Sequence, residues 1–482
     1  MAMLLALAAC ATSPGLRIRQ SDFNALEARF NSHIATLASE EFAGRRPGTE
    51  GEDKTLAYLR SEFERIGLVS GTNDPAHPWN APVLLASVAS GDSRIELQVG
   101  RRRVELAAAQ TFALTPRRRG LVERGEMVFV GFADAEIPEE AVRGRVALML
   151  AEPGLSAARR AKLFEAGPAA VLTIVADAGS IEQMRSFASE ERLVLASEAG
   201  TELEAFASTE AIAGALGEKR WQGLREAAEA GRAGAGFEPT LLDARITIEA
   251  TAQRREVPSH NLIGRLPGRN PNAGAILLLA HWDHFGTCGP DDAADRLCNG
   301  AVDNASGLAL MIELTRRLAK GKPLERDVYV LATTAEEWGL LGARAFAEEP
   351  PIPLDNFIAA FNFDTVAIGP RGSPVGFIGE GRTPLDAVIK QAIADMRREM
   401  APRERVEPFL QRQDGWALLQ RDVPAVVISN AFGDEALLNG YLGGDYHQAS
   451  DNPGPLQLGG AIDDLLLHEL LVRRLADPKQ YP

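Results

Sequence analysis

Apolar residues recur at helical spacing in three segments of the chain, at 22–37, 50–66 and 307–320. In the second segment, Leu59 and Phe63 fall on the same side because residues four apart share one face of a helix. A Gly-rich stretch, 300–306, comes directly before the third segment. The spacing predicts three amphipathic helices, the last of which opens from a glycine-rich loop.

Four other segments are nearly continuous apolar runs: 275–280, 328–331, 357–361 and 423–428. Such runs are typical of strands that are buried on both faces of a sheet. From about residue 242 onward, runs of this kind alternate with helical segments. This order predicts an α/β fold with a mixed, mostly parallel sheet that is flanked by helices.

A central stretch of the chain differs from the rest in its pattern of apolar and polar residues. It combines short strand-like runs at 127–130, 146–150 and 170–175 with an Ala/Glu-rich helical middle. We therefore predict a small, β-rich domain that is inserted into the main one. The expected parts are an N-terminal signal segment with linker at 1–21, the two portions of the main domain at 22–110 and 241–482, and the insert at 111–240.

The amino-acid composition limits the classes of protein to which the chain can belong. The 482 residues are 45% hydrophobic and 24% charged, which is typical of a soluble globular chain with two or three domains. The net charge is −15, and no long basic block occurs. Because phosphate binding needs concentrated Lys and Arg, we expect no nucleic-acid partner. The sequence makes no prediction about oligomeric state.

The three cysteines indicate export. Residues 1–9 are almost wholly apolar and end in small residues before Cys10, which is typical of a bacterial lipoprotein signal. In this interpretation Cys10 is lipidated, and the protein is periplasmic or anchored to the outer membrane only through that lipid. An ordinary N-terminal segment is the alternative. Cys288 and Cys298 could then close their polar loop as a disulfide, whereas two free cytosolic thiols are the alternative.

Potential metal ligands follow the predicted strands or precede the predicted third helix. In an open α/β sheet the ligand crevice lies beyond the carboxyl ends of the strands, so these side chains are expected to converge. Imidazole and carboxylate ligands together suit zinc and also accept cobalt or manganese. Their number favours two metals bridged by a carboxylate. The set consists of His281, Asp303, Glu336, Glu337, Asp364 and His447.

Five blocks of sequence carry a family resemblance. They are AHWDH at 280–284, GAVDNASG at 300–307, AEEWGLLG at 335–342, NFD at 362–364 and DYHQASD at 445–451. In this order they resemble the metal-site blocks of peptidase family 28, the co-catalytic di-zinc aminopeptidases. The resemblance implies a zinc exopeptidase (phosphorylase/hydrolase-like) fold. It covers the chain apart from the insert, which itself resembles a protease-associated domain.

The resemblance also implies roles for the metal ligands. Two Zn²⁺ ions would be bridged by Asp303, with His281 and Asp364 completing one ion and Glu337 and His447 completing the other. Co²⁺ or Mn²⁺ are possible substitutes. The family pattern further implies a cis peptide bond after Asp303.

Four neighbouring residues have expected roles as well. The resemblance makes Glu336 the general base, because an unligated carboxylate beside the metals can move the proton of the attacking water. Asp283 is expected to accept the second imidazole N–H of His281. Tyr446 would polarise the scissile carbonyl, or else is a buried tyrosine bonded to a backbone carbonyl. His284 is either a donor near the ligands or an ordinary loop histidine.

The function implied by this resemblance is that of a zinc-dependent exopeptidase. An aminopeptidase that hydrolyses N-terminal residues from peptides is the leading hypothesis, with peptides as the expected partners. Two alternatives stay open. One is a glutaminyl-cyclase-like acyltransferase, which uses a single zinc and lacks the ligand at the position of His281. The other is a non-catalytic binding protein on the same scaffold.

Overall fold

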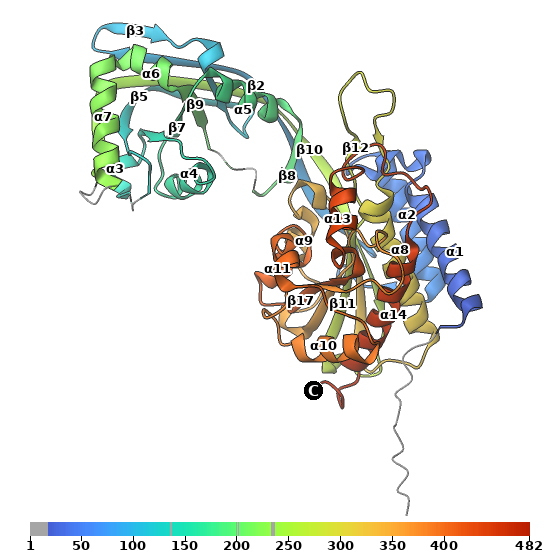
Figure 1. The fold of residues 1–482 in the computed structure, drawn as a ribbon. Coiled ribbons are helices and arrows are strands. Elements are labelled where there is room, and N and C mark those ends of the chain that lie inside the picture. The colour runs from blue at the N-terminus through green and yellow to red at the C-terminus, as the bar shows by residue number, and fades with distance from the viewer. Residues whose placement is uncertain (1–17, 135–136, 199, 201, 233–236) are drawn as a thin grey trace, which may run out of the picture. The chain divides into compact units, whose positions relative to one another are not determined.

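The computed structural model describes residues 18–134, 137–198, 200, 202–232 and 237–482. The chain forms two compact units (Figure 1). Of the described residues, those at 18–84 and 258–482 make up the first, and those between 85 and 257 make up the second. The insert predicted at 111–240 lies within the range of the second unit, which extends beyond it at both ends.

The first unit is built on a mixed sheet whose centre is parallel. The strands follow the order β16, β17, β15, β11, β14, β10, and β1 also pairs with β10. The four central strands are parallel to one another, whereas β16, β10 and β1 pair antiparallel. This confirms the predicted fold class. The bounds are β1 (Val69–Ser70), β10 (Thr240–Leu266), β11 (Ala275–His281), β14 (Asp327–Thr333), β15 (Phe357–Asn362), β16 (Gly376–Ile378) and β17 (Ala425–Ser429).

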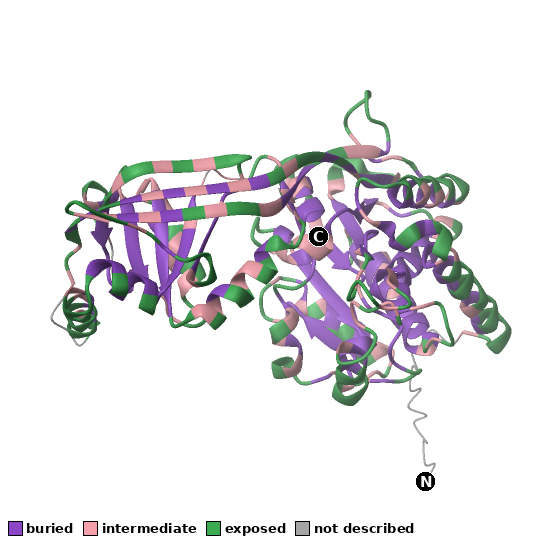
Figure 2. Ribbon diagram, turned by 90° about the horizontal axis from the view of Figure 1, so that it is seen from above, coloured by how far each residue is buried: buried purple, intermediate pink, exposed green. Residues whose placement is uncertain are grey.

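Helices cover both faces of this sheet because its central strands are apolar on both sides. On β11, Leu278 belongs to the core beneath α1, α2, α8 and α14, whereas Leu277 and Leu279 belong to the core beneath α9 and α12. Figure 2 shows the strands buried and the outer faces of the helices exposed. The bounds are α1 (Gln20–Leu37), α2 (Glu50–Ile66), α8 (Gly307–Lys320), α9 (Leu341–Glu348), α10 (Asp386–Asp395), α11 (Arg403–Val406), α12 (Gly415–Leu419), α13 (Glu435–Leu442) and α14 (Leu458–Leu475).

The second unit has its own hydrophobic core, and its strands pair with one another and with β10. Strands β5, β6, β7 and β9 are parallel, and β4 and β10 border them as antiparallel partners. Strand β2 pairs with β3 and β8. The bounds are β2 (Asn80–Val99), β3 (Arg102–Glu105), β4 (Thr111–Leu114), β5 (Arg119–Phe129), β6 (Val146–Leu150), β7 (Ala170–Val175), β8 (Arg192–Leu195) and β9 (Glu204–Ser208), with helices α3 (Glu139–Val142), α4 (Ser156–Glu165), α5 (Ala178–Ser189), α6 (Thr209–Leu216) and α7 (Glu218–Ala230).

No helix in the described parts of the chain combines the length and the apolar character that a bilayer crossing requires. Cys10 lies outside the described residues, so its lipidation stays a prediction.

Candidate metal centre

The expected ligands gather at the carboxyl edge of the parallel strands. His281 is the last residue of β11 and pairs in register with Thr333, the last residue of β14. The short helical turn η6 (Glu336–Trp338) begins three residues later. Asp364 follows two residues after β15 ends. The strand register therefore delivers an imidazole and several carboxylates to one edge, as the sequence predicts.

Asp303 lies between two groups of ligand atoms. Its Oδ1 is 3.1 Å from Nε2 of His281, which is itself 3.5 Å from Oδ1 of Asp364. Its Oδ2 is 3.4 Å from Nε2 of His447, and that nitrogen is 3.0 Å from Oε2 of Glu337. One carboxylate thus presents each of its oxygens to a different imidazole. This is the geometry that a bridging ligand requires.

The buried acceptors around Asp303 have no hydrogen-bond partners within the described part of the chain. These atoms are Nε2 of His281, Oδ1 of Asp303, Oε1 of Glu337 and Nε2 of His447. The ligand atoms of His281, Asp303 and Asp364 lie within 4.8 Å of one another. Buried polar atoms normally have a hydrogen-bond partner, and atoms left without one here would lower the free energy of unfolding. Cations at this position would satisfy them, so the residues fit a metal centre.

The pKa values of the buried carboxylates also favour a metal centre. Burial, reinforced by nearby carboxylates, raises the pKa of Glu336 and of Glu337 above the usual range of a glutamate. Burial alone would also raise the pKa of Asp303, but the adjacent imidazoles of His281 and His447 hold it well below its ordinary value. A cation at this position would lower the raised pKa values of both glutamates.

Asp283 differs from its expected contact. Nδ1 of His281 donates to the backbone carbonyl of Asp283 at 3.2 Å, while the nearer carboxylate oxygen is 3.9 Å away. The carboxylate instead accepts the backbone N–H groups of Glu336 (3.1 Å) and Glu337 (3.5 Å). The imidazole tautomer is therefore fixed by a carbonyl, and the Asp283 side chain positions the turn that carries the glutamates.

Two residues that sequence reasoning left without a role hold the loop of Asp303. The carboxylate of Asp451 accepts the backbone N–H of Val302 (2.9 Å) and of Asp303 (3.0 Å). The buried Arg45 guanidinium donates to four backbone carbonyls, those of Leu37, Trp282, Asn299 and Gly300. Asp451 lies inside the last of the five sequence blocks, and that position was the available signal, whereas Arg45 lies outside all five. The peptide bond after Asp303 is cis, as the resemblance implies.

Cys288 and Cys298 are paired as a disulfide with a Cα–Cα distance of 5.8 Å. They belong to a small hairpin of β12 (Gly286–Thr287) and β13 (Leu297–Cys298). The disulfide expected in an oxidising compartment is therefore present, in the loop that joins His281 to Asp303.

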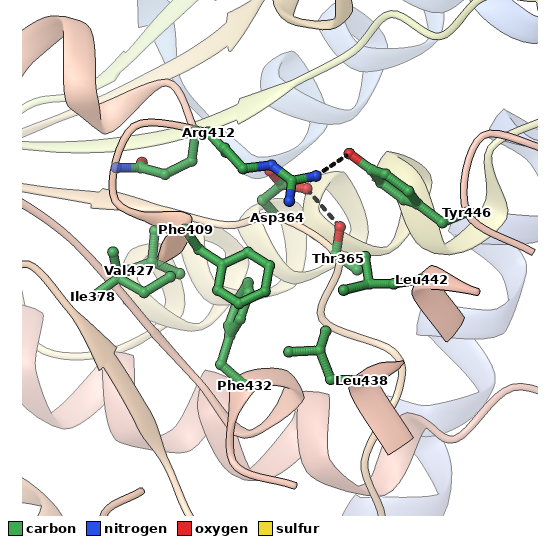
Figure 3. Close-up of a pocket in the computed structure, with 11 residues that line it drawn as sticks. Asp364, Thr365, Ile378, Phe409, Arg412, Val427, Phe432, Leu438, Leu442 and Tyr446 are labelled. Carbon is green, nitrogen blue, oxygen red and sulfur yellow. Dashed lines mark hydrogen bonds between the residues drawn. The ribbon is translucent and has the colours of Figure 1, made fainter. Parts of the chain in front are cut away.

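A pocket opens beside the ligands (Figure 3). It offers about 440 Å³ of space, part of it open to solvent. Nη2 of Arg412 donates to the Tyr446 hydroxyl at 3.4 Å, and the Tyr446 ring stacks on His447 with 3.7 Å between centroids. Tyr446 thus contacts a side chain and the cleft, which differs from the carbonyl-bonded alternative. The pocket is lined by Asp364, Thr365, Ile378, Phe409, Arg412, Gln413, Val427, Phe432, Leu438, Leu442 and Tyr446.

A mixed, helix-covered sheet with imidazoles and carboxylates at the carboxyl edge of its parallel strands is typical of metal-dependent hydrolases. Residues 261–462 match the family model of peptidase family M28. This part of the chain belongs to that family.

Similarity to individual proteins is local in sequence and broad in structure. The chain is 30% identical over 131 residues to the alkaline phosphatase isozyme conversion protein of Escherichia coli, covering 25% of this chain and 37% of that protein. It is 28% identical over 157 residues to the probable lipoprotein aminopeptidase LpqL of Mycobacterium tuberculosis, covering 32% and 29%. The chain thus spans well under half the length of these relatives.

One solved structure resembles the whole fold. An aminopeptidase from Aneurinibacillus sp. strain AM-1 is 17% identical and superposes with a TM-score of 0.52, and the match covers 92% of each chain. At this level of identity the likeness establishes a common fold.

Proposed function

We propose that the protein is a metal-dependent exopeptidase, and specifically an aminopeptidase that hydrolyses N-terminal residues from peptides. The observation that carries this proposal is the position of Asp303, whose two oxygens face His281 and His447 on opposite sides. Membership of residues 261–462 in peptidase family M28 supports the reaction type. Two similar proteins, one named a probable lipoprotein aminopeptidase and the other an aminopeptidase, support removal of residues from the N-terminus.

The ion-binding residues would form two positions that share Asp303. His281 and Asp364 would complete one position, and Glu337 and His447 would complete the other. The mixture of imidazole and carboxylate donors favours Zn²⁺, with Co²⁺ or Mn²⁺ as substitutes. When bound, the ions would polarise the peptide carbonyl and lower the pKa of the attacking water.

Glu336 would move the proton in this reaction. Its backbone N–H is held by Asp283, and within the described residues no hydrogen-bond or ion-pair partner contacts its carboxylate. The carboxylate is thus free to take a proton from the attacking water and to deliver it to the leaving amine. The Tyr446 hydroxyl would donate to the carbonyl oxygen as negative charge develops on it. The pocket beside Asp364 would receive a side chain next to the scissile bond.

The test is a comparison of metal content and peptide cleavage in one preparation of the full chain. We expect bound zinc by elemental analysis and cleavage of chromogenic aminoacyl substrates. Chelation should abolish the cleavage, and added Zn²⁺ should restore it. A metallated protein that cleaves neither free-amine nor blocked peptides would contradict the proposal and favour a binding function. Cyclisation of N-terminal glutamine without hydrolysis would favour the acyltransferase.

Two proposals concern the rest of the chain. We propose that the second unit is a protease-associated domain, and that the protein is exported and lipidated at Cys10. The apolar segment before Cys10 and the disulfide of Cys288 with Cys298 support export. Mass spectrometry of the N-terminal peptide from cells tests the second proposal, because a diacylglyceryl group on Cys10 is expected and an unmodified thiol would refute it.

A further inference from the structure

His284 is buried within the metal centre, and its ring is held in one orientation. Its Nδ1 lies 2.9 Å from the backbone carbonyl oxygen of Cys298. Because a carbonyl oxygen only accepts, Nδ1 must carry the hydrogen and donate it. In the neutral ring, Nε2 then carries a free lone pair and no hydrogen. The side chain is fully buried, so water does not reach it.

The free nitrogen of this ring faces carboxylate oxygens. Nε2 of His284 has no hydrogen-bond partner within the described residues, and it lies 3.5 Å from Oε1 of Glu337, another buried atom without a partner. The ligand atoms of His284, Asp303 and Glu337 are all within 4.8 Å of one another. Lone pairs that face each other in a buried space repel unless a proton or a metal cation lies between them. Nε2 of His284 is therefore placed as a metal ligand would be.

Packing prevents the ring from turning away. A side chain on Gly300 would place its Cβ 2.9 Å from Cγ of His284, so only glycine leaves room for the imidazole there. The rings of Phe285 and His447 contact it edge-on, with centroids 5.1 Å and 6.0 Å away. The backbone of the following residues is fixed by the hairpin in which Gly286 pairs with Cys298.

On this basis we infer that His284 is a further ligand of the ion held by Glu337 and His447. The inference rests on the proposed metal centre and makes its two positions unequal. One position has four protein ligands, His284, Asp303, Glu337 and His447. The other has three, His281, Asp303 and Asp364. A tetrahedral ion with four protein ligands is closed, whereas three ligands leave a coordination place for water or substrate. The His284 position would therefore bind its ion more tightly, and the His281 position would be the one open to substrate.

The test measures ion binding on the full chain rather than catalysis. Metal-free protein is titrated with Zn²⁺ and with Co²⁺, and the visible spectrum of Co²⁺ reports the number of nitrogen ligands. We expect a tight step followed by a weaker step. His284→Gln and His284→Ala should lower the affinity of the tight step by more than about 100-fold, which exceeds the loss expected for a residue that only orients a ligand. Both variants should also change the Co²⁺ spectrum of that step. His77→Gln removes an exposed imidazole as the matched control.

A second measurement does not depend on the variants folding. In wild-type protein with isotope-labelled histidine and bound cadmium, NMR should detect three imidazoles coupled to cadmium, those of His281, His284 and His447. Two coupled imidazoles would overturn the inference. A His284 variant with the wild-type spectrum and less than a tenfold loss of affinity would also overturn it and would make His284 a hydrogen-bond acceptor for a protonated Glu337.

The outcomes separate this inference from the proposed function. If wild-type protein binds ions through three imidazoles yet hydrolyses no peptide, the inference stands and the proposed function fails. If it hydrolyses peptides but the His284 variants keep both ions with unchanged spectra, the function stands and the inference fails. If it binds no divalent ion, both are wrong.

Discussion

The chemistry of single residues in this site depends on which buried atoms lack a protein partner. The carboxylate of Asp283 is engaged by backbone N–H groups, so it shapes the turn rather than contacting ions. Glu336 and Glu337 are neighbours in that turn, yet only Glu337 contacts His447. One side chain is thus directed at the ion-binding atoms, while the other keeps a free carboxylate. The local backbone thus directs two adjacent glutamates to different positions, and they have different roles.

Glu336→Gln tests this division at the scale of the residue. The amide keeps the size of the side chain but cannot take a proton, so kcat for a chromogenic aminoacyl substrate should fall by about 10²–10⁴-fold. Metal content should stay at the wild-type level, because Glu336 is not among the expected ligands. Glu348→Gln, an exposed glutamate on α9, is the control and should leave both quantities unchanged. Near-normal turnover in Glu336→Gln would show that another group moves the proton.

Among the elements, the strands that are buried on both faces were the most predictable part of the chain. The run at 146–150 coincides with β6, and the run at 275–280 is one residue shorter than β11. Both are buried on two faces, so their apolar character is continuous. Strand β10 was missed over much of its length because charged residues such as Arg254 and Arg255 break its alternating pattern. Because β10 continues past residue 240, the second unit extends to Val257, and it begins at Leu85 because it includes most of β2.

The connections made by Arg45 could not be predicted because they join segments that are distant in sequence. The guanidinium donates to backbone carbonyls of Leu37, Trp282, Asn299 and Gly300, and no spacing rule links these positions. The ligand set, by contrast, followed from the ends of consecutive strands and from the family blocks. His284 shows the limit of that approach, since its two interpretations could be compared only once the direction of its ring was known.

Arg45→Met should therefore destabilise the loop between β11 and α8. The substitution keeps an unbranched side chain but leaves four buried carbonyls without their donor, and each unsatisfied buried group costs about 1–3 kcal/mol. We expect the free energy of unfolding in urea to fall by at least about 3 kcal/mol, together with weaker zinc binding. Arg60→Met removes an arginine that pairs with Glu64 at the surface of α2 and is the control, with a change below about 1 kcal/mol. Equal stability of both variants would contradict the assigned role.

For the whole molecule, metal binding and folding stability are linked through the protons that a cation displaces. Burial alone would lower the pKa of His447, but the carboxylates of Asp303 and Glu337 raise it from 6.5 to about 10 in the cation-free site. The pKa of Glu337 is raised as well, first by burial and then by Asp303. In both groups the folded protein binds its proton more tightly than the unfolded chain does. A metal ion at this position would replace those protons.

The stability of the metal-free protein should consequently depend on pH in a defined direction. A group whose pKa is higher in the folded state contributes its full stabilisation below the unfolded value, and this contribution is lost as the pH rises through the folded value. For His447 the loss runs from about pH 6.5 to about pH 10, and Glu337 adds to it in the same direction. We expect the urea midpoint of chelated protein to fall across this range, whereas that of zinc-loaded protein should change less because the ion has already displaced the protons. His447→Gln, measured in the chelated state, should flatten the profile. Parallel profiles for chelated and zinc-loaded protein would show that these two side chains do not exchange protons for metal.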